Sequence, residues 1–265
     1  MKIIDCHCHI HKPEWVEAND GKDFVINKYN LSVDENTILA NMEEAGISQT
    51  IIFPFASSIL DLEKANQYTI DISKRYSDKL IPFTVIDNKP EYWYEQGCRG
   101  FKEHTYGQRI QKDSKGNDIY SQKFKQSYKF LEKNKLPLLL HAGNNRVERI
   151  IDDLLHDTPN LIIILAHLGA DFPENNNYMP HEEQVYSTLE KLKDFGNVYF
   201  DISAVTEGVI IKEAINIVGD KRILFGADSP IESPLKTRLR LQSLGLSEST
   251  LENIFYNNIN NILEL

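Results

Sequence analysis

Two histidines near the start of the chain, His7 and His9, have the spacing that lets one metal ion bind both. They end an apolar segment that predicts a buried strand. Because side chains alternate between the two faces of a strand, Asp5, His7 and His9 are expected on one face, with Cys6 and Cys8 on the other. Imidazole is a common zinc ligand, so the segment predicts a metal site, in which Asp5 could orient a ligand.

Polar residues also end four later apolar segments. One such residue alone would usually be a core group with a satisfied hydrogen bond, since burying it without a partner is costly. The carboxyl ends of the strands of a barrel meet on one face, so several such residues predict one shared metal site there. They are Lys102, Glu103 and His104 after one segment, then His141, His167 and Asp228 after three others.

The elements that would position these residues alternate regularly along the chain. Continuous apolar runs are typical of parallel strands covered by helices on both faces. Strands are expected at 2–9, 49–55, 80–86, 98–103, 136–141, 161–167, 197–203 and 222–228. Helices are expected from Asp34 to Ala45 with a stop at Gly46, at 61–75, 119–134, 146–156, 182–195, 207–218 and 235–244, and after Ser247, with a short aromatic segment at 89–96. Eight strand–helix units in about 250 residues predict one (β/α)8 barrel domain over residues 1–265, with a doubly wound sheet as the alternative.

Composition narrows the class of partner. The net charge of −10 argues against a nucleic-acid or anionic membrane surface, and no apolar run approaches the about 18 residues of a membrane helix. Three cysteines without a disulfide framework and no visible secretory signal predict a cytoplasmic protein. The alternation along the first strand argues against cysteine ligation of a metal. We therefore expect a small-molecule substrate, and a homo-oligomer remains open.

The ordered set of these residues resembles the amidohydrolase superfamily, and within it the amidohydrolase-related branch of metal-dependent hydrolases. The motifs that carry the resemblance are Asp5-x-His7-x-His9, Gly100-Phe101-Lys102-Glu103, His141, His167 and Gly226-Ala227-Asp228. They run from the first expected strand to the eighth. The resemblance implies a (β/α)8 barrel in which His7, His9 and Asp228 hold the more buried metal ion. It also implies that His141 and His167 hold a second ion when one is present.

Glu103 determines how many ions to expect. Counted from Gly100, it falls where binuclear relatives carry a bridging carboxylate or a carbamylated lysine, so we expect it to bridge two ions. The alternative is that Glu103 points outward and pairs with a helix lysine. Neighbours on a strand cannot both face the metal, so Lys102 would be a substrate contact or a packing group. In a mononuclear site, His141 would join the first ion and His167 would orient water or substrate.

The expected ligands suggest a mechanism. Imidazole and carboxylate suit one or two zinc ions, with manganese, iron or nickel as alternatives. Metal binding lowers the pKa of water from about 15.7 to about 7, which supplies hydroxide to attack a carbonyl. The resemblance implies that Asp228 is the general acid and base that moves the proton to the leaving group. The alternative for Asp228 is a helix N-cap before Ser229.

Three long segments after expected strands, at 10–33, 104–118 and 168–181, should form the walls of the pocket. Candidate substrate contacts are Lys102, Tyr106, Arg109 and Arg146. Asp201 and Ser203 end the seventh strand, where Asp201 is expected either as a structural or ligand-supporting carboxylate or as a site group. His11 is expected to be peripheral to the site, and His156 and His181 are expected in a loop or on a helix surface. Aromatic and polar side chains together suit a small organic substrate such as a sugar acid, lactone or ring amide.

Three functions fit these residues. The first is a metal-dependent hydrolase of a small ester, lactone or amide, which a second metal bridged by Glu103 would favour. The second is a lyase that performs nonoxidative decarboxylation or hydration with one ion, which a single metal with Lys102 in the pocket would favour. The third is a non-catalytic metal-binding barrel. Asp228 argues against that third function, because closed structural zinc sites rarely keep an open position beside a base.

Overall fold

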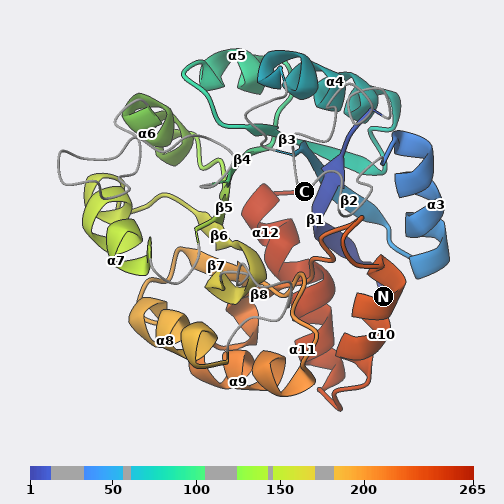
Figure 1. Ribbon diagram of the computed structural model, residues 1–265, viewed down its shortest axis with the longest axis vertical. Helices are drawn as coiled ribbons and strands as arrows, with labels where there is room; N and C mark the ends of the chain where they lie inside the picture. The colour runs from blue at the N-terminus through green and yellow to red at the C-terminus, as the bar shows by residue number, and fades with distance from the viewer. Residues whose placement is uncertain (13–32, 56–60, 105–123, 143–145, 171–181) are drawn as a thin grey trace, which may run out of the picture.

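The strands of this protein form a ring, and the helices form a second ring around it (Figure 1). The computed structural model describes residues 1–12, 33–55, 61–104, 124–142, 146–170 and 182–265. Eight parallel strands follow one another in chain order around a nearly closed barrel. An isolated bridge between Cys8 and Ser229 joins the last strand region to the first. The predicted (β/α)8 barrel is therefore confirmed, and the alternative of a doubly wound sheet is wrong.

Each predicted strand is present, although the last ones are shorter than expected. The strands are β1 Ile4–Ile10, β2 Gln49–Pro54, β3 Leu80–Val85, β4 Gly100–His104, β5 Leu138–His141, β6 Ile163–Leu165, β7 Val198–Asp201 and β8 Ile223–Leu224. After β6 the chain enters the short helical turn η4 Ala166–Gly169, where His167 and Leu168 have φ angles of 56° and 55°. This left-handed backbone ends the strand earlier than the apolar run predicts.

The helices between the strands match the predicted positions in the described part of the chain. They are α3 Glu35–Ala45, α4 Leu62–Arg75, α5 Pro90–Glu95, α6 Lys125–Lys133, α7 Val147–Arg149, α8 Glu182–Leu192, α9 Gly208–Val218, α10 Pro234–Gln242, α11 Glu248–Glu252 and α12 Asn258–Leu263. The shorter helical turns are η3 Ile150–Leu155, η5 Asp220–Arg222 and η6 Asn253–Asn257. The helix expected at 119–134 corresponds to α6, and its residues 119–123 lie outside the described part of the chain.

The predicted ends of the first helix are confirmed in detail. Asp34 accepts a hydrogen bond from the Thr37 backbone N–H at 2.9 Å, which satisfies one of the free donors of the first turn. The helix ends at Gly46, whose φ of 61° is in the left-handed region that glycine adopts without a steric penalty. Ser247 likewise accepts from the Thr250 N–H at 3.1 Å and begins α11.

Apolar residues form two layers, one inside the barrel and one between the strands and the helices. The inner cluster includes Ile4, Phe53, Phe83, Leu139 and Leu224, and it continues into Ile259, Ile262 and Leu263 of α12. Figure 1 shows α12 across the centre of the ring. Because Leu263 accepts a hydrogen bond from Arg99, which precedes β4, α12 covers the amino end of the barrel. The carboxyl end is left for the polar residues.

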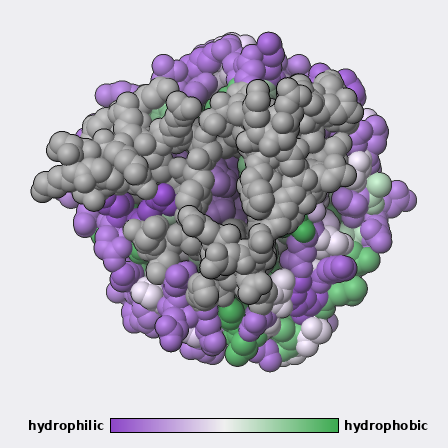
Figure 2. Space-filling view, in the orientation of Figure 1, coloured by the Kyte–Doolittle hydropathy of each residue, from purple (hydrophilic) through white to green (hydrophobic). Residues whose placement is uncertain are grey.

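The exterior of the molecule is more polar than its core. In Figure 2 the described residues around the rim of the view are mostly hydrophilic, as expected for helices that turn their apolar faces toward the strands. No helix among the described residues is long and apolar enough to cross a membrane. The three cysteines, Cys6, Cys8 and Cys98, are buried and free of disulfide bonds.

One sequence prediction about β1 is wrong. Asp5 pairs with Thr50 of β2 and Cys8 pairs with Ile52, so three steps along β1 match two along β2, and β1 contains a bulge. The extra residue breaks the alternation of faces. Cys6 therefore lies in the inner cluster, whereas Cys8 packs with the outer one. Asp5 lies with Cys8 on the side of α3, not on the face of the histidines.

Candidate metal centre

The ends of β1 and β8 bring His7, His9 and Asp228 together at the carboxyl end of the barrel. Asp228 Oδ1 lies 3.3 Å from His7 Nε2 and 3.2 Å from His9 Nε2. Ligand atoms around a tetrahedral ion at about 2.0–2.2 Å lie about 3.3–3.6 Å from one another, so the observed spacing is close to that of a single ion's ligands. All three side chains are buried.

The donor atoms themselves fit a cation. Among the described residues, His7 Nε2 and Asp228 Oδ1 are buried and have no hydrogen-bond partner. A buried polar atom without a partner costs free energy, and a metal ion would satisfy both atoms at once. Two imidazoles and a carboxylate are also the donor set of many zinc and manganese sites.

Backbone hydrogen bonds hold the two ligand-bearing strands against each other. The Asp228 N–H donates to the His7 carbonyl at 2.8 Å, and the His9 N–H donates to the Ser229 carbonyl at 2.8 Å. Asp228 has a φ of 63°, a strained conformation for a residue with a side chain, and such strain is frequent at functional sites. Close packing is also required at Gly226, where a Cβ atom would lie 3.0 Å from His7 Cβ.

Asp201, at the end of β7, accepts hydrogen bonds from both His7 and His167. His7 Nδ1 donates to Asp201 Oδ2 at 2.8 Å, which leaves the lone pair of His7 on Nε2, the atom that faces Asp228. Asp201 Oδ1 also accepts from the backbone N–H groups of His167 and Ser203, each at 3.0 Å. Burial raises the pKa of Asp201, but its interactions with His7, including the hydrogen bond, outweigh burial and hold that pKa well below its usual range.

A row of imidazoles continues from His7 along the strand ends. The ring centroids are 5.0 Å apart from His7 to His167, 4.7 Å from His167 to His141, and 4.3 Å from His141 to His104. His167 Nδ1 donates to the Ser203 carbonyl at 3.0 Å, so its Nε2 also keeps a lone pair, 4.0 Å from Asp228 Oδ2. His167 and His141 thus lie beside the cluster, as predicted from their positions at strand ends.

Burial determines the charge of four imidazoles at this end of the barrel. It lowers the pKa of His9, His104 and His141 well below the usual range, and it lowers the pKa of His167 to about 4. The rings are therefore neutral at pH 7, which is the form that binds a metal. The sequence-based prediction places His104 at a strand end but gives it no ligand role. Alternation along β4 is the signal that could have found it, because His104 shares the inner face with Lys102, two residues earlier.

Glu103 lies on the other side of β4. Its two carboxylate oxygens accept hydrogen bonds from the Tyr128 hydroxyl of α6 at 3.0 and 2.9 Å. It faces the helices because it alternates with Lys102 and His104, and the structure does not bring it to the histidines. The prediction that Glu103 bridges two ions is therefore wrong. Glu103 points outward, as in the alternative prediction, but its partner is a tyrosine rather than a lysine. Burial raises the pKa of Glu103 to about 7.

Comparison with known proteins decides the family. The family model described as Amidohydrolase matches residues 4–265. The chain belongs to the amidohydrolase family. No curated protein matches it. Among solved structures, 2,6-dihydroxybenzoate decarboxylase from Rhizobium is similar, with a TM-score of 0.75 and 16% identity over 100% of this chain and 99% of that one.

Two further solved structures have the same fold. One is a dihydroxybenzoic acid decarboxylase from Polaromonas sp. JS666 with bound manganese and 2-nitroresorcinol, with a TM-score of 0.77 and 17% identity over 100% of this chain and 97% of that one. The other is a probable 2-pyrone-4,6-dicarboxylic acid hydrolase from Acinetobacter baumannii with bound citric acid. It has a TM-score of 0.73 and 13% identity, and all of both chains is covered.

Lys102 points into the barrel of this amidohydrolase. Its Nζ lies 5.0 Å from the centroid of the Phe53 ring, and that ring contacts His7 and His9 edge-on at 5.1 and 4.8 Å. The ammonium is buried without a hydrogen-bond partner within the described ranges. Burial lowers the pKa of Lys102 to about 8.

Of the remaining candidates in this amidohydrolase, Arg146, His156 and His11 are among the described residues. Arg146 is almost buried, donates to the Ala142 carbonyl at 3.1 Å, and contributes to the lowered pKa of His104. Tyr106, Arg109 and His181 lie outside the described residues. His156 is on the surface, as predicted. His11, expected to be peripheral to the site, is fully buried with its ring 5.9 Å from that of Phe55.

Proposed function

We propose that this amidohydrolase is a mononuclear metal-dependent enzyme that removes carbon dioxide from a small organic acid without oxidation. The observation that carries the proposal is the contrast between Asp228 and Glu103. Asp228 lies 3.2–3.3 Å from both β1 histidines, while Glu103 is bonded to Tyr128 on the helix side. Without a bridging carboxylate among the described residues, this arrangement favours one ion. The sequence hypothesis linked a single ion with Lys102 nearby to lyase chemistry.

The resident ion would be held by His7, His9 and Asp228, with His167 and His141 beside them. Zinc suits this donor set, and manganese, present in the Polaromonas decarboxylase, is the alternative. When bound, such an ion would supply a positive charge that polarises an oxygen atom of the substrate.

The chain's own residues provide binding and proton transfer. The buried ammonium of Lys102 and the guanidinium of Arg146 provide positive charge for a carboxylate. In decarboxylation the bond between carbon and the carboxylate breaks, its electron pair stays on the carbon, and that carbon takes a proton. Asp228 Oδ2, turned toward His167, is the oxygen that would carry this proton. Carboxylated aromatic acids are the substrates named for the decarboxylases of similar fold.

Hydrolysis of a lactone that carries carboxylates is the second candidate. The placement of Asp228 also suits this reaction, since a carboxylate beside the imidazoles can take a proton from water and return it to the leaving alkoxide. One protein of similar fold is described as a probable 2-pyrone-4,6-dicarboxylic acid hydrolase. Both candidates share an anionic substrate and differ in the bond that breaks.

Activity assays with two sets of substrates, hydroxybenzoates and pyrone carboxylates, test the proposed decarboxylation. Zinc- or manganese-loaded protein would be incubated with hydroxybenzoates, with carbon dioxide release as the readout, and with pyrone carboxylates, with ring opening followed by absorbance. We expect carbon dioxide release that is lost in Asp228→Asn and retained in Glu103→Gln. Ring opening without carbon dioxide release would select the hydrolase instead. Equal loss of activity in both variants would contradict the different roles given to the two carboxylates.

A further inference from the structure

Asp5 lies behind the metal ligands, on the side of β1 that faces α3. Its Oδ1 atom accepts two backbone hydrogen bonds, from the His7 N–H at 3.0 Å and from the Ala227 N–H at 3.0 Å. The first donor belongs to a ligand residue, and the second belongs to the residue before Asp228. One carboxylate oxygen therefore joins the backbones of both strands that carry the candidate ligands.

The β1 bulge explains why this acceptor is needed. An extra residue between Asp5 and Cys8 interrupts the pairing with β2, so a backbone N–H there needs another acceptor. The carboxylate of Asp5 is that acceptor for His7. Because the Asp228 N–H donates to the His7 carbonyl at 2.8 Å, the bonds form a closed set that links Asp5, His7 and the successive residues Ala227 and Asp228.

We propose that Asp5 is a positioning residue of the metal centre, whose carboxylate holds the His7 and Asp228 backbones at the separation one ion requires. The inference rests on the metal centre proposed above. Asp5 acts through the backbone, since its side chain is on the opposite face of β1 from the histidines. Loss of the shared acceptor would let β1 and β8 shift independently, and His7 Nε2 and Asp228 Oδ1 would no longer be held 3.3 Å apart.

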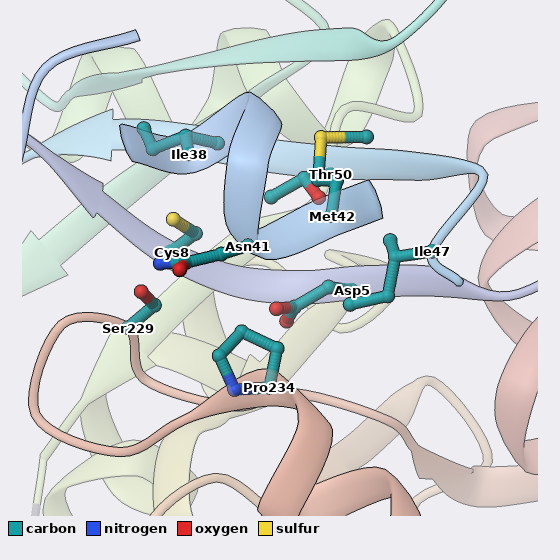
Figure 3. Close-up of a pocket in the computed structure, with 9 residues that line it drawn as sticks. All are labelled: Asp5, Cys8, Ile38, Asn41, Met42, Ile47, Thr50, Ser229 and Pro234. Atoms are coloured by element: carbon teal, nitrogen blue, oxygen red, sulfur yellow. The ribbon is translucent and has the colours of Figure 1, made fainter. Parts of the chain in front are cut away.

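The surroundings of Asp5 supply a matched control. Asp5 and Thr50 line a cavity of about 10 Å³ between β1, β2, α3 and the chain before α10, with Cys8, Asn41, Ser229 and Pro234 among the other lining residues (Figure 3). The volume suits about one water molecule. Thr50 is the Cα partner of Asp5, and its hydroxyl has no hydrogen-bond partner among the residues that the structure describes. Thr50→Val thus alters the same cavity without touching the ligand-bearing backbone.

Cobalt binding separates positioning from general stability. The metal-free wild type, Asp5→Asn, Asp5→Ala and Thr50→Val would be titrated with Co²⁺, with the visible d–d spectrum and the Kd recorded well below each protein's Tm. Asp5→Ala should weaken Co²⁺ binding about 10–100-fold and change the spectrum, the range usual for residues that orient metal ligands. Asp5→Asn keeps an oxygen acceptor and should retain most of the affinity. Thr50→Val should match the wild type.

Wild-type Co²⁺ affinity and spectrum in Asp5→Ala would overturn the inference, as would equal weakening in Thr50→Val. If Asp5→Ala does not fold, Asp5→Glu takes its place, because it keeps the charge and moves the oxygen by one methylene. It should weaken binding, and wild-type behaviour would overturn the inference. Absence of Co²⁺ binding by the wild type would overturn the metal centre and this inference together. Binding by the wild type with an unchanged Asp5→Ala would overturn the inference alone.

Discussion

Single hydrogen bonds decide which atoms of the histidines face the proposed ion. Asp201 accepts a hydrogen bond from His7 Nδ1–H and the Ser203 carbonyl accepts one from His167 Nδ1–H, so both rings direct Nε2 toward Asp228. Neighbours on one strand take opposite roles, since Lys102 faces the barrel interior and Glu103 bonds to Tyr128. The chemistry of each side chain therefore depends on the face of the strand from which it projects.

Lys102→Met should separate binding from stability. The Lys102 ammonium is buried without a hydrogen-bond partner in the described part of the chain, which is costly, and methionine fills a similar volume without a charge. The variant should therefore unfold at a Tm equal to or above that of the wild type. Loss of the charge-assisted bond to a substrate carboxylate should raise KM about tenfold or more, with a smaller change in kcat. Steady-state kinetics and thermal unfolding at pH 7 check both effects. An unchanged KM would contradict a substrate contact at Lys102.

Glu103→Gln should change the pH dependence of stability. Burial raises the pKa of Glu103 from 4.5 to about 7, so between these values the unfolded chain releases a proton that the folded protein retains. Wild-type stability should therefore fall as pH rises from about 4.5 to 7, relative to Glu103→Gln, by up to about 3 kcal/mol. The glutamine can still accept from Tyr128. Urea unfolding across this range measures the difference.

The control for that series is Glu91→Gln, which removes one negative charge at an exposed position of α5. A constant difference between Glu103→Gln and the wild type from pH 4.5 to 7 would contradict the description of Glu103 as a buried group that is neutral at the acid end of this range.

At the scale of strands and helices, apolar runs and helix caps were enough to predict the order of the elements. The strand ends could also be predicted where polar residues follow apolar ones, which located His7, His9 and Asp228. The β1 bulge could not be predicted, because it depends on a bond from Ala227 to Asp5 across 222 positions of sequence. Aligning Glu103 with the bridging ligand of binuclear relatives by its distance from Gly100 gave the wrong face of β4. Side chains alternate along a strand, so an inward Gly100 would have predicted an inward Lys102 and an outward Glu103.

Gly100→Ala tests the packing that orients β4. A Cβ atom at Gly100 would lie 2.3–2.6 Å from three atoms of the Phe83 ring, so the ring or the strand must move. We expect a loss of about 1–3 kcal/mol in the free energy of unfolding, as for other overpacked cores. Gly196→Ala is the control, because a Cβ there meets nothing within 4 Å among the described residues. Equal stabilities of the two variants in urea unfolding would contradict this packing.

At the scale of the whole molecule, closure of the barrel creates the site. The first and last strands meet through the Asp228–His7 and His9–Ser229 backbone bonds, so ligands from opposite ends of the chain converge. α12 covers the amino end with apolar residues, and the buried polar groups gather at the carboxyl end. The sequence could predict this convergence from the eightfold alternation of elements. The number of ions expected depends on whether Lys102 or Glu103 faces the barrel interior, and the folded chain turns Lys102 inward and Glu103 toward α6.

The number of zinc ions per chain, measured by native mass spectrometry, tests the central claim most directly. The wild type, Glu103→Gln and His9→Ala would be purified without chelator and reloaded with zinc. One ion in the wild type and in Glu103→Gln, with loss of that ion in His9→Ala, is the result predicted from the cluster of His7, His9 and Asp228. Two ions in the wild type that fall to one in Glu103→Gln would contradict the single-ion centre and restore Glu103 as a bridging ligand.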